Sequence, residues 1–231
     1  MQGVWLGQAG FLFTAPSGAT VMIDPYLSNS LEERRGAAFH REVPIRREFL
    51  QPPDILVLTH CHEDHCDFGT LDQLFGARRM TVLAPAGVFP LLRERYPEQA
   101  EFVLFTPGTE VTLGPWALRA VFAAHSDPGA VGVVLSCGGK QVYHMGDTLY
   151  HRRILTEDVR GMDLLLLPVN GRGNNMNAAD AARMAQALSP AAALPMHWDM
   201  FRSLGGGAED FAARLEGPAV LLPRHYEHFT I

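Results

Sequence analysis

Residues 54–67, DILVLTHCHEDHCD, decide how the rest of the chain is interpreted. The run Asp54–Leu58 is short, apolar and continuous, which is typical of a strand covered on both faces. The polar loop that follows holds four potential metal ligands within six residues: His60, His62, Asp64 and His65. In an extended segment the two histidines of HxH point to the same side, and the Asp-His pair follows after the chain turns. The stretch therefore predicts two adjacent positions for metal ions.

Three more residues with the same ligand chemistry end apolar runs farther along the chain. They are His125, Asp147 and His197. Each comes where a strand would deliver its side chain to the edge of a sheet, a rigid platform for ligands. Imidazole and carboxylate together suit zinc, and also manganese or iron. One histidine at such a position is usually structural, but seven candidates in this pattern predict a metal centre.

Length and composition limit the classes of protein to consider. The chain has 231 residues, 47% of them apolar, which predicts one domain over residues 1–231. A net charge of −6 argues against a general nucleic-acid surface. The sequence contains neither a membrane-length apolar run nor a basic leader. Three cysteines are typical of a reduced, cytoplasmic protein, and Cys61 and Cys66 are interpreted as buried thiols rather than as further ligands.

Short apolar runs separated by Gly and Pro predict a β-rich chain with a few helices. The run Val4–Phe13 and the strand Thr20–Ile23 flank a Pro-Ser-Gly turn, which predicts a hairpin. Residues 28–50 lack periodicity and are interpreted as an exposed, irregular loop. The predicted helices are Thr70–Phe75, Val88–Tyr96, Asn177–Leu188 and Ala208–Leu215. The other predicted strands are Thr81–Leu83, Phe102–Phe105, Glu110–Leu113, Ala117–Ala123, Gly132–Ser136, Gln141–His144, Asp163–Pro168, Ala191–Leu194 and, last, Ala219–Leu222. Two β-rich halves of this kind favour two sheets face to face with helices outside.

With these residues in place, the chain resembles the metallo-β-lactamase superfamily. The signature H-x-H-x-D-H is met in full at residues 60–65, and Asp147 lies in a Gly-Asp-Thr. The resemblance implies an α/β fold, the αββα sandwich of two mixed sheets with helices on the outer faces. It also implies the distribution of ligands. One ion would take His60, His62 and His125, the other would take Asp64, His65 and His197, and Asp147 would bridge both.

This resemblance implies hydrolysis by a metal-bridging hydroxide. Two divalent ions can deprotonate a shared water near neutral pH, and Asp64 and Asp147 are the catalytic candidates because their carboxylates hold those ions. His62 stands where oxygen-reducing di-iron members carry Glu. Zn²⁺ is therefore favoured, Mn²⁺ is the alternative metal, and a redox di-iron protein is a further hypothesis.

Finer motifs look like the L-ascorbate-6-phosphate lactonase-like branch of small metal-dependent hydrolases. They lie at Leu6–Phe11, Ile23–Ser28, Cys66-Asp67, Leu167–Gly171 and Met196–Asp199. The chain is much shorter than the lactonase itself. The implied substrate is a small ester, lactone or phosphoester, with a phosphorylated sugar lactone as one candidate.

Several residues outside the ligand set are candidates for supporting roles. Asp67 could orient a ligand imidazole or cap the helix that follows, and Asp24 could form a turn or orient a ligand. Asn170 and Arg172, in a Gly-rich loop at a strand end, could bind an anionic substrate. His225 is a weaker substrate candidate, and Arg46 and Arg47 are weaker still.

Alternative functions stay open at this point. A phosphodiesterase or phospholipase D-like hydrolase would share the fold, and a sensor or scaffold would bind metal without catalysis. The partner expected is a small anionic molecule, with no nucleic acid and no membrane, and homo-oligomerisation is left undecided by the sequence.

Overall fold

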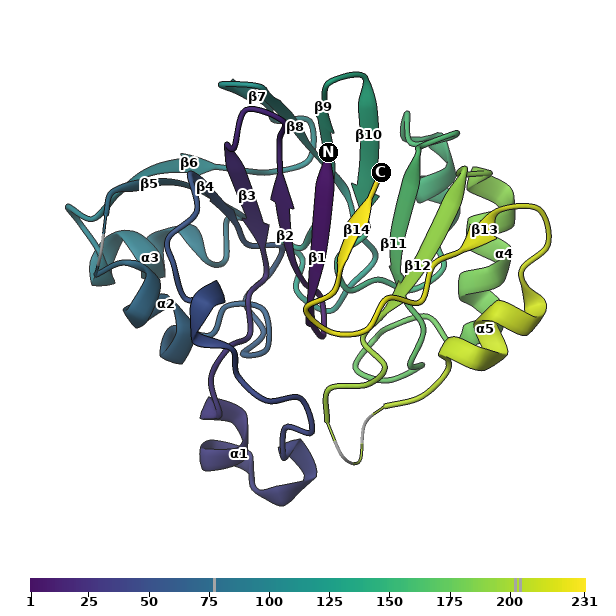
Figure 1. The fold of residues 1–231 in the computed structure, drawn as a ribbon, viewed down its shortest axis with the longest axis horizontal. Coiled ribbons are helices and arrows are strands. Elements are labelled where there is room, and N and C mark those ends of the chain that lie inside the picture. The colour runs from purple at the N-terminus through teal and green to yellow at the C-terminus, as the bar shows by residue number, and fades with distance from the viewer. Residues whose placement is uncertain (77, 202, 204) are drawn as a thin grey trace.

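Two seven-stranded mixed sheets stack face to face in a computed structural model that describes residues 1–76, 78–201, 203 and 205–231 (Figure 1). The first sheet has the order β14-β1-β2-β3-β4-β5-β6, and the second has the order β13-β12-β11-β10-β9-β8-β7. The first is built from β1 (Gln2–Gly7), β2 (Gly10–Thr14), β3 (Thr20–Ile23), β4 (Ile55–Val57), β5 (Met80–Ala84), β6 (Ala100–Leu104) and β14 (His228–Thr230). The second is built from β7 (Glu110–Leu113), β8 (Trp116–Phe122), β9 (Val131–Cys137), β10 (Lys140–His144), β11 (Leu164–Pro168), β12 (Ala192–Met196) and β13 (Ala219–Val220).

Helices cover the outer faces of both sheets. They are α2 (Phe68–Leu74), α3 (Phe89–Arg95), α4 (Ala178–Leu188) and α5 (Ala208–Arg214), whereas α1 (Ser30–Arg35) lies at one end of the sandwich (Figure 1). Leu71 of α2 and Leu92 of α3 pack on the first sheet, whereas Met184 of α4 and Phe211 of α5 pack on the second. This arrangement confirms the predicted αββα sandwich. Among the described residues, no helix is long and apolar enough to cross a membrane.

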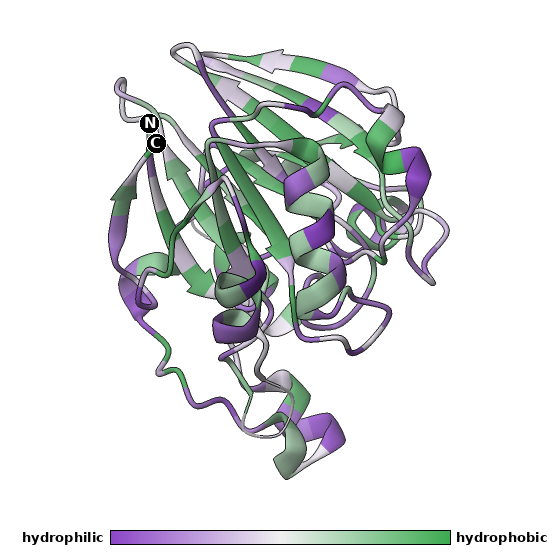
Figure 2. Ribbon diagram, turned by 90° about the vertical axis from the view of Figure 1, so that its right-hand side faces the viewer, coloured by the Kyte–Doolittle hydropathy of each residue, from purple (hydrophilic) through white to green (hydrophobic). Residues whose placement is uncertain are grey.

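The core between the sheets explains why the strands are so apolar. Trp5, Phe11 and Phe13 of the first sheet pack against Leu164 and Leu166 of the second, and all five are buried. In Figure 2 the hydrophobic residues lie mainly on the strands, and the most hydrophilic ones lie on outer helices and loops. The short buried strand β4 directly precedes the histidine-rich loop, as predicted, so the core fixes the origin of that loop.

Two strand predictions are corrected by the structure. The run Val4–Phe13 is two antiparallel strands, β1 and β2, because the chain reverses at Gln8 and Ala9. Gly7 adopts φ +100° at that turn, a conformation that glycine reaches without strain. The last strand is β14, and it pairs antiparallel with β1 rather than continuing the second sheet. This strand is only three residues long and two of them are exposed, so its hydrophobic pattern in the sequence is weak.

The segment 28–50 is not an irregular, exposed loop. It contains α1 and two short 3₁₀ turns, Ala37–Phe39 and Arg47–Phe49. The buried side chain of Arg41 anchors it by donating hydrogen bonds to the carbonyl oxygens of Tyr26 and Val43 and to the Tyr226 hydroxyl. Arg41 also forms an isolated β-bridge with Phe201. Long-range contacts of this kind leave no periodic pattern, so the sequence did not reveal them.

Candidate metal centre

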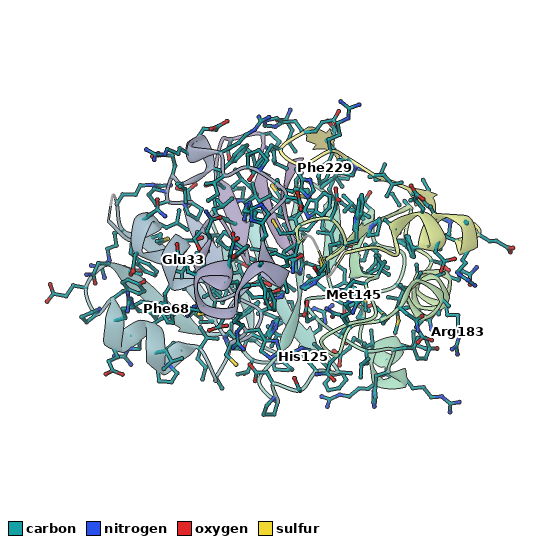
Figure 3. The ribbon with its side chains drawn as sticks, turned by 90° about the horizontal axis from the view of Figure 1, so that it is seen from below. Glu33, Phe68, His125, Met145, Arg183 and Phe229 are labelled. Atoms are coloured by element: carbon teal, nitrogen blue, oxygen red, sulfur yellow. The ribbon has the colours of Figure 1, made fainter. Side chains whose placement is uncertain are left out.

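All seven predicted ligands meet at one end of the sandwich, the end at which α1 lies (Figures 1 and 3). The loops after β4, β8, β10 and β12 each supply part of the cluster. Figure 3, seen from that end, shows His125 between the two halves of the molecule. Strand ends from both sheets therefore converge on one site, as their positions after apolar runs predicted.

One group of donors consists of His60, His62, His125 and Asp147. Their donor atoms all lie within 4.8 Å of one another. The three rings are packed closely, with centroids 4.5 Å apart for His60 and His125 and 4.7 Å apart for His62 and His125. Four N and O donors at such spacing could hold one metal ion of the zinc type.

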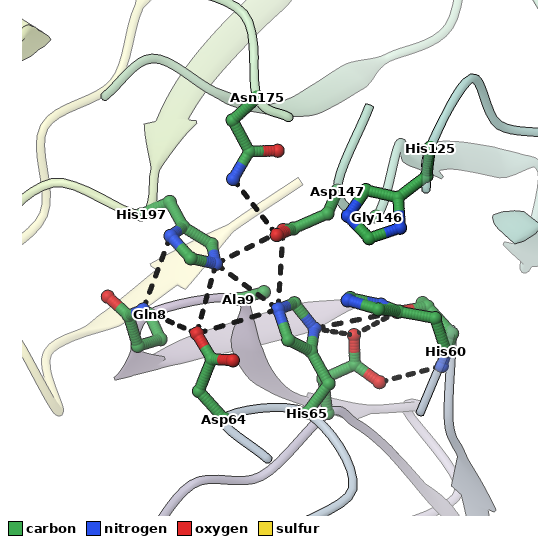
Figure 4. Close-up of polar contacts among 12 residues, drawn as sticks. Gln8, Ala9, His60, Asp64, His65, His125, Gly146, Asp147, Asn175 and His197 are labelled. Carbon is green, nitrogen blue, oxygen red and sulfur yellow. Dashed lines mark hydrogen bonds and ion pairs between the residues drawn. The ribbon is translucent and has the colours of Figure 1, made fainter. Parts of the chain in front are cut away.

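A second group, Asp64, His65 and His197, meets the same distance limit. Asp147 lies against this group too, because its Oδ1 is 3.3 Å from Nε2 of His65 and 3.1 Å from Nε2 of His197 (Figure 4). The two Nε2 atoms are themselves 3.1 Å apart. Asp147 thus belongs to the first group and also contacts two histidines of the second.

Unpartnered polar atoms support metal binding at this place. His60 Nε2 and His125 Nε2 are buried and make no hydrogen bond within the described chain, and the buried Asp147 Oδ1 faces the His197 and His65 nitrogens at 3.1 and 3.3 Å. Buried polar atoms are nearly always hydrogen-bonded, and a cluster of exceptions calls for an explanation such as an ion. The chemistry of the donors fits a divalent metal, since every unpartnered atom can offer a lone pair.

Electrostatics place His60 and Asp147 in the forms that ligate metals. Burial, and after it the charge of His65, lowers the pKa of His60 well below its usual value, so its imidazole is neutral. Burial would raise the pKa of Asp147, yet the facing His197 and His65 hold it well below the usual range. A neutral imidazole and an ionised carboxylate are the required ligand forms. His65 differs: although burial lowers its pKa, the charges of Asp147, Asp64 and Asp24 raise that pKa well above its usual value, so a metal would have to displace its proton.

Asp24 orients two of the ligands through hydrogen bonds. Its buried carboxylate lies 2.7 Å from His65 Nδ1 and 2.5 Å from the Thr59 hydroxyl. That hydroxyl lies 3.0 Å from His60 Nδ1. A hydrogen bond at Nδ1 fixes the proton there and leaves Nε2 free for a metal. Asp24 therefore acts on His65 directly and on His60 through Thr59.

Asp67 has a different role from the orienting one considered for it. Its carboxylate accepts from the backbone N–H groups of Gly69 and Thr70, so it caps α2, the other role considered. It also accepts from the hydroxyls of Ser28 and Ser30, 2.6 and 2.7 Å away. Within the described part of the chain its hydrogen bonds reach no ligand imidazole. Asp67 ties segment 28–50 to the helix beside the metal loop.

A cavity of about 290 Å³ opens directly on the donor atoms. Its lining includes Asp64, Asp147 and His197, and beside them the predicted substrate residues Asn170 and Arg172. Other lining residues are Gln8, Phe39, His62, Gly173, Asn175 and Phe201. The exposed Arg172 side chain has no ion pair or hydrogen bond within the described residues, so its charge is available at the rim.

Three predicted basic residues lie away from this cavity. The ring of His225 stacks on Trp5 with centroids 4.1 Å apart, and His225 is not among the cavity residues. Arg46 lies over the ring of Tyr226, 5.1 Å from its centroid, and Arg47 is exposed in the second 3₁₀ turn. The structure therefore brings Asn170 and Arg172 to the site and leaves these three outside it.

Of the two cysteines predicted to be buried thiols, Cys66 is buried and Cys61 is not. Burial raises the pKa of Cys66 to about 12, so it stays a thiol. Cys61 is exposed, and its backbone N–H donates to Asp127 Oδ2 at 3.0 Å. The donor groups among the described residues contain no cysteine.

Sequence reasoning missed several residues of the site. Asn175 donates to Asp147 Oδ2 at 2.9 Å, and Gln8 donates to Asp64 Oδ2 at 2.8 Å. Phe39 and Phe201 form an apolar wall of the cavity, with ring centroids 5.5 Å apart. Asn175 was within reach of prediction, since it belongs to the same Gly-rich, Asn-rich loop as Asn170.

Comparison with known sequences agrees with this geometry. The family model of the beta-lactamase superfamily domain matches residues 19–198. A UPF0173 metal-dependent hydrolase of Aeropyrum pernix is 30% identical over 228 residues, which cover 92% of this chain and 88% of that protein. One of Anaeromyxobacter sp. strain K is 31% identical over 233 residues, covering 93% and 81%. The chain thus belongs to the metallo-β-lactamase superfamily and, within it, to the UPF0173 family of metal-dependent hydrolases.

Solved structures are similar to the fold at low sequence identity. Igni18, a metallo hydrolase from Ignicoccus hospitalis, has a TM-score of 0.76 at 18% identity, covering 100% of this chain and 98% of its own. An isothiocyanate hydrolase from Delia radicum gut bacteria reaches 0.78 at 18%, covering 100% and 99%. The di-iron β-hydroxylase CmlA of Streptomyces venezuelae reaches 0.77 at 18%, but this chain covers only 53% of it. One fold thus carries hydrolases and an iron enzyme, so the site must indicate the chemistry.

Proposed function

We propose that this metal-dependent hydrolase binds two divalent ions, preferably Zn²⁺, and hydrolyses a small anionic ester, lactone or phosphoester. The observation that carries the proposal is the position of Asp147. One oxygen of its buried carboxylate lies 3.1 and 3.3 Å from two histidines of one donor group, while the residue also completes the other group. A carboxylate placed in this way fits a two-ion site, because it could hold ions in both donor groups.

The chain's own residues would divide the work as follows. His60, His62 and His125 would hold one ion, Asp64, His65 and His197 the other, and Asp147 both. Two bound metal ions would supply Lewis acidity for the substrate oxygen and would lower the pKa of a water molecule toward neutrality. Asn175 holds one oxygen of Asp147 by its hydrogen bond and so directs the other oxygen at the donors.

The cavity supports a small substrate that carries a negative charge. About 290 Å³ is at the small end of ligand pockets. Arg172, whose guanidinium has no ion pair within the described residues, lies at the rim, and a guanidinium can bind a phosphate or carboxylate with two hydrogen bonds. Phe39 and Phe201 offer an apolar wall for the carbon skeleton. A phosphorylated sugar lactone combines these features.

The alternatives find less support in the site. A sensor or scaffold would favour a centre closed off from solvent, whereas the cavity here opens beside Asp64, Asp147 and His197. A redox di-iron centre usually includes more carboxylate than this donor set, which has five histidines and two aspartates. A phosphodiesterase of the same fold differs in substrate only, so it belongs in the same assay.

Metal analysis and a substrate panel test the proposal together. Protein loaded with Zn²⁺ or Mn²⁺ should hold two ions per chain and hydrolyse members of a panel of lactones, phosphodiesters and phosphorylated sugars. Visible absorption distinguishes di-iron protein, because zinc and manganese sites absorb hardly at all. A ratio that stays at one ion under excess metal would refute the two-ion site. Turnover absent across the whole panel in two-ion protein would favour the scaffold.

A further inference from the structure

The tip of the β1–β2 hairpin carries Gln8 into the metal centre. Gln8 is only 4% exposed and has φ +49°, a left-handed backbone that is uncommon outside glycine. The turn is tightly built, since a Cβ at Gly10 would lie 3.0 Å from the Gly7 oxygen and 3.1 Å from the Asp24 oxygen. Gln8 also lies outside residues 19–198, the part matched by the family model.

The side chain of Gln8 holds the donor Asp64 by a hydrogen bond and lies against the donor His197, which is far from Asp64 in the sequence. Its Nε2 donates to Asp64 Oδ2 at 2.8 Å and lies 3.2 Å from His197 Nδ1 (Figure 4). An ionised carboxylate can only accept hydrogen bonds, so the NH₂ end of the amide must face Asp64. The orientation of the Gln8 amide is therefore set by the donor that it holds.

The backbone of Gln8 is hydrogen-bonded to His197 as well. Its carbonyl oxygen accepts from the backbone N–H of His197 at 3.1 Å and from the Trp5 indole N–H at 3.0 Å. His197 also has a left-handed backbone, with φ +69°. Two strained residues from different sheets are thus joined to each other, and such conformations persist where the surroundings fix them.

From these contacts we infer that Gln8 is a positioning residue for the donor group of Asp64, His65 and His197. Its amide sets the Asp64 carboxylate against the His197 ring, so that both face the point at which an ion would bind. The inference rests on the two-ion site proposed above. It assigns Gln8 no contact with reacting atoms, because its effect passes through Asp64 and His197.

Gln8→Met tests this role with little change of shape. Methionine has a similar length and the same left-handed backbone to accommodate, but it cannot donate to Asp64. We expect Gln8→Met to bind one equivalent of Zn²⁺ like the wild type and the other about 10–100-fold more weakly. The Co²⁺-loaded protein should also show a changed absorption band for that ion. Gln2→Met makes the same substitution at an exposed position of β1 and should match the wild type in both measurements.

The outcomes separate positioning from a purely structural role. A lower melting temperature of metal-free Gln8→Met with unchanged affinity for both ions, and an unchanged Co²⁺ spectrum, would overturn the inference. If the variant does not fold, the Gln8 side-chain amide signal of ¹⁵N-Gln-labelled wild type gives the answer during Zn²⁺ titration. A signal that moves as the ions bind supports positioning, and a fixed signal contradicts it.

The two proposals fail in different ways. The number of ions bound by the wild type decides the two-ion site alone. The ratio of affinities between wild type and Gln8→Met decides the role of Gln8, and it stays measurable even if the wild type binds a single ion at Asp64 and His197.

Discussion

His225 should make the protein lose stability in mild acid, and the structure sets the size of that loss. The ring is stacked on Trp5 and its side chain is only 12% exposed. Burial, and after it the Arg41 charge, lowers the pKa of His225 from 6.5 to about 4. In the unfolded chain His225 is protonated below about pH 6.5, whereas in the folded protein it is protonated only below about pH 4. The free energy of unfolding should therefore fall with pH in this window, by about 2 kcal/mol between pH 7.5 and pH 5 from this residue.

His225→Phe isolates the effect, because phenylalanine keeps the stack on Trp5 and does not titrate. Urea unfolding of both proteins at pH 7.5 and pH 5, under identical metal conditions, gives the two free energies. We expect the variant to gain about 2 kcal/mol relative to wild type on going to pH 5. His228→Phe, at an exposed position of β14, serves as the matched control and should keep the wild-type slope. If the free energies of unfolding of wild type and His225→Phe differ by the same amount at both pH values, the reasoning is refuted. Asp199, whose carboxylate lies 3.8 Å from His225 Nδ1, would then be the first group to reconsider.

Three further variants test the metal centre and the cavity. Asp147→Asn should lower turnover by orders of magnitude and release an ion while circular dichroism stays near normal, because the charge in contact with both donor groups is removed; wild-type turnover would exclude the bridging role. Asp24→Asn should weaken metal binding about 10–100-fold by titration calorimetry, since His65 loses its charged acceptor; unchanged binding would contradict this. Arg172→Ala should cost about ten- to a hundredfold in kcat/KM on a phosphorylated substrate and little on its dephosphorylated partner. Equal losses on both substrates would argue against anion binding by Arg172.

The clustering of the seven candidate donors could be predicted because their positions follow local rules. His60, His62, Asp64 and His65 are contiguous and follow a strand that is recognisable from five residues of sequence. His125, Asp147 and His197 each end an apolar run, and strands of a sandwich end at common edges. Periodicity and strand ends are properties of the local chain, so they survive in the sequence without knowledge of the fold.

The walls of the site could not be predicted, because they depend on contacts between distant segments. Phe39 lies at the cavity in a segment that Arg41 ties to Tyr26 and Tyr226. Nothing within residues 28–50 marks a buried arginine, and its charged neighbours look like a solvated surface. Gln8 lies inside the run Val4–Phe13, which the pattern of apolar residues predicts as one strand. The turn between β1 and β2 that directs its side chain toward Asp64 was therefore not predicted.

The Phe39 segment and Gln8, the two features that the sequence did not predict, would have different roles around the metal centre. Substrate selectivity would arise at the apolar wall that contains Phe39. The seven donors come from strand ends that the shared core holds in place. Phe39 belongs to a segment fastened by one arginine, and Phe201 belongs to a loop bridged to that same Arg41. Loops carried by a rigid scaffold vary more readily than the scaffold itself. Changes at Phe39 or Phe201 should therefore alter which carbon skeleton fits the cavity while the metal content stays the same. Changes at Gln8 should do the opposite, because its amide touches the donors Asp64 and His197 rather than the apolar wall.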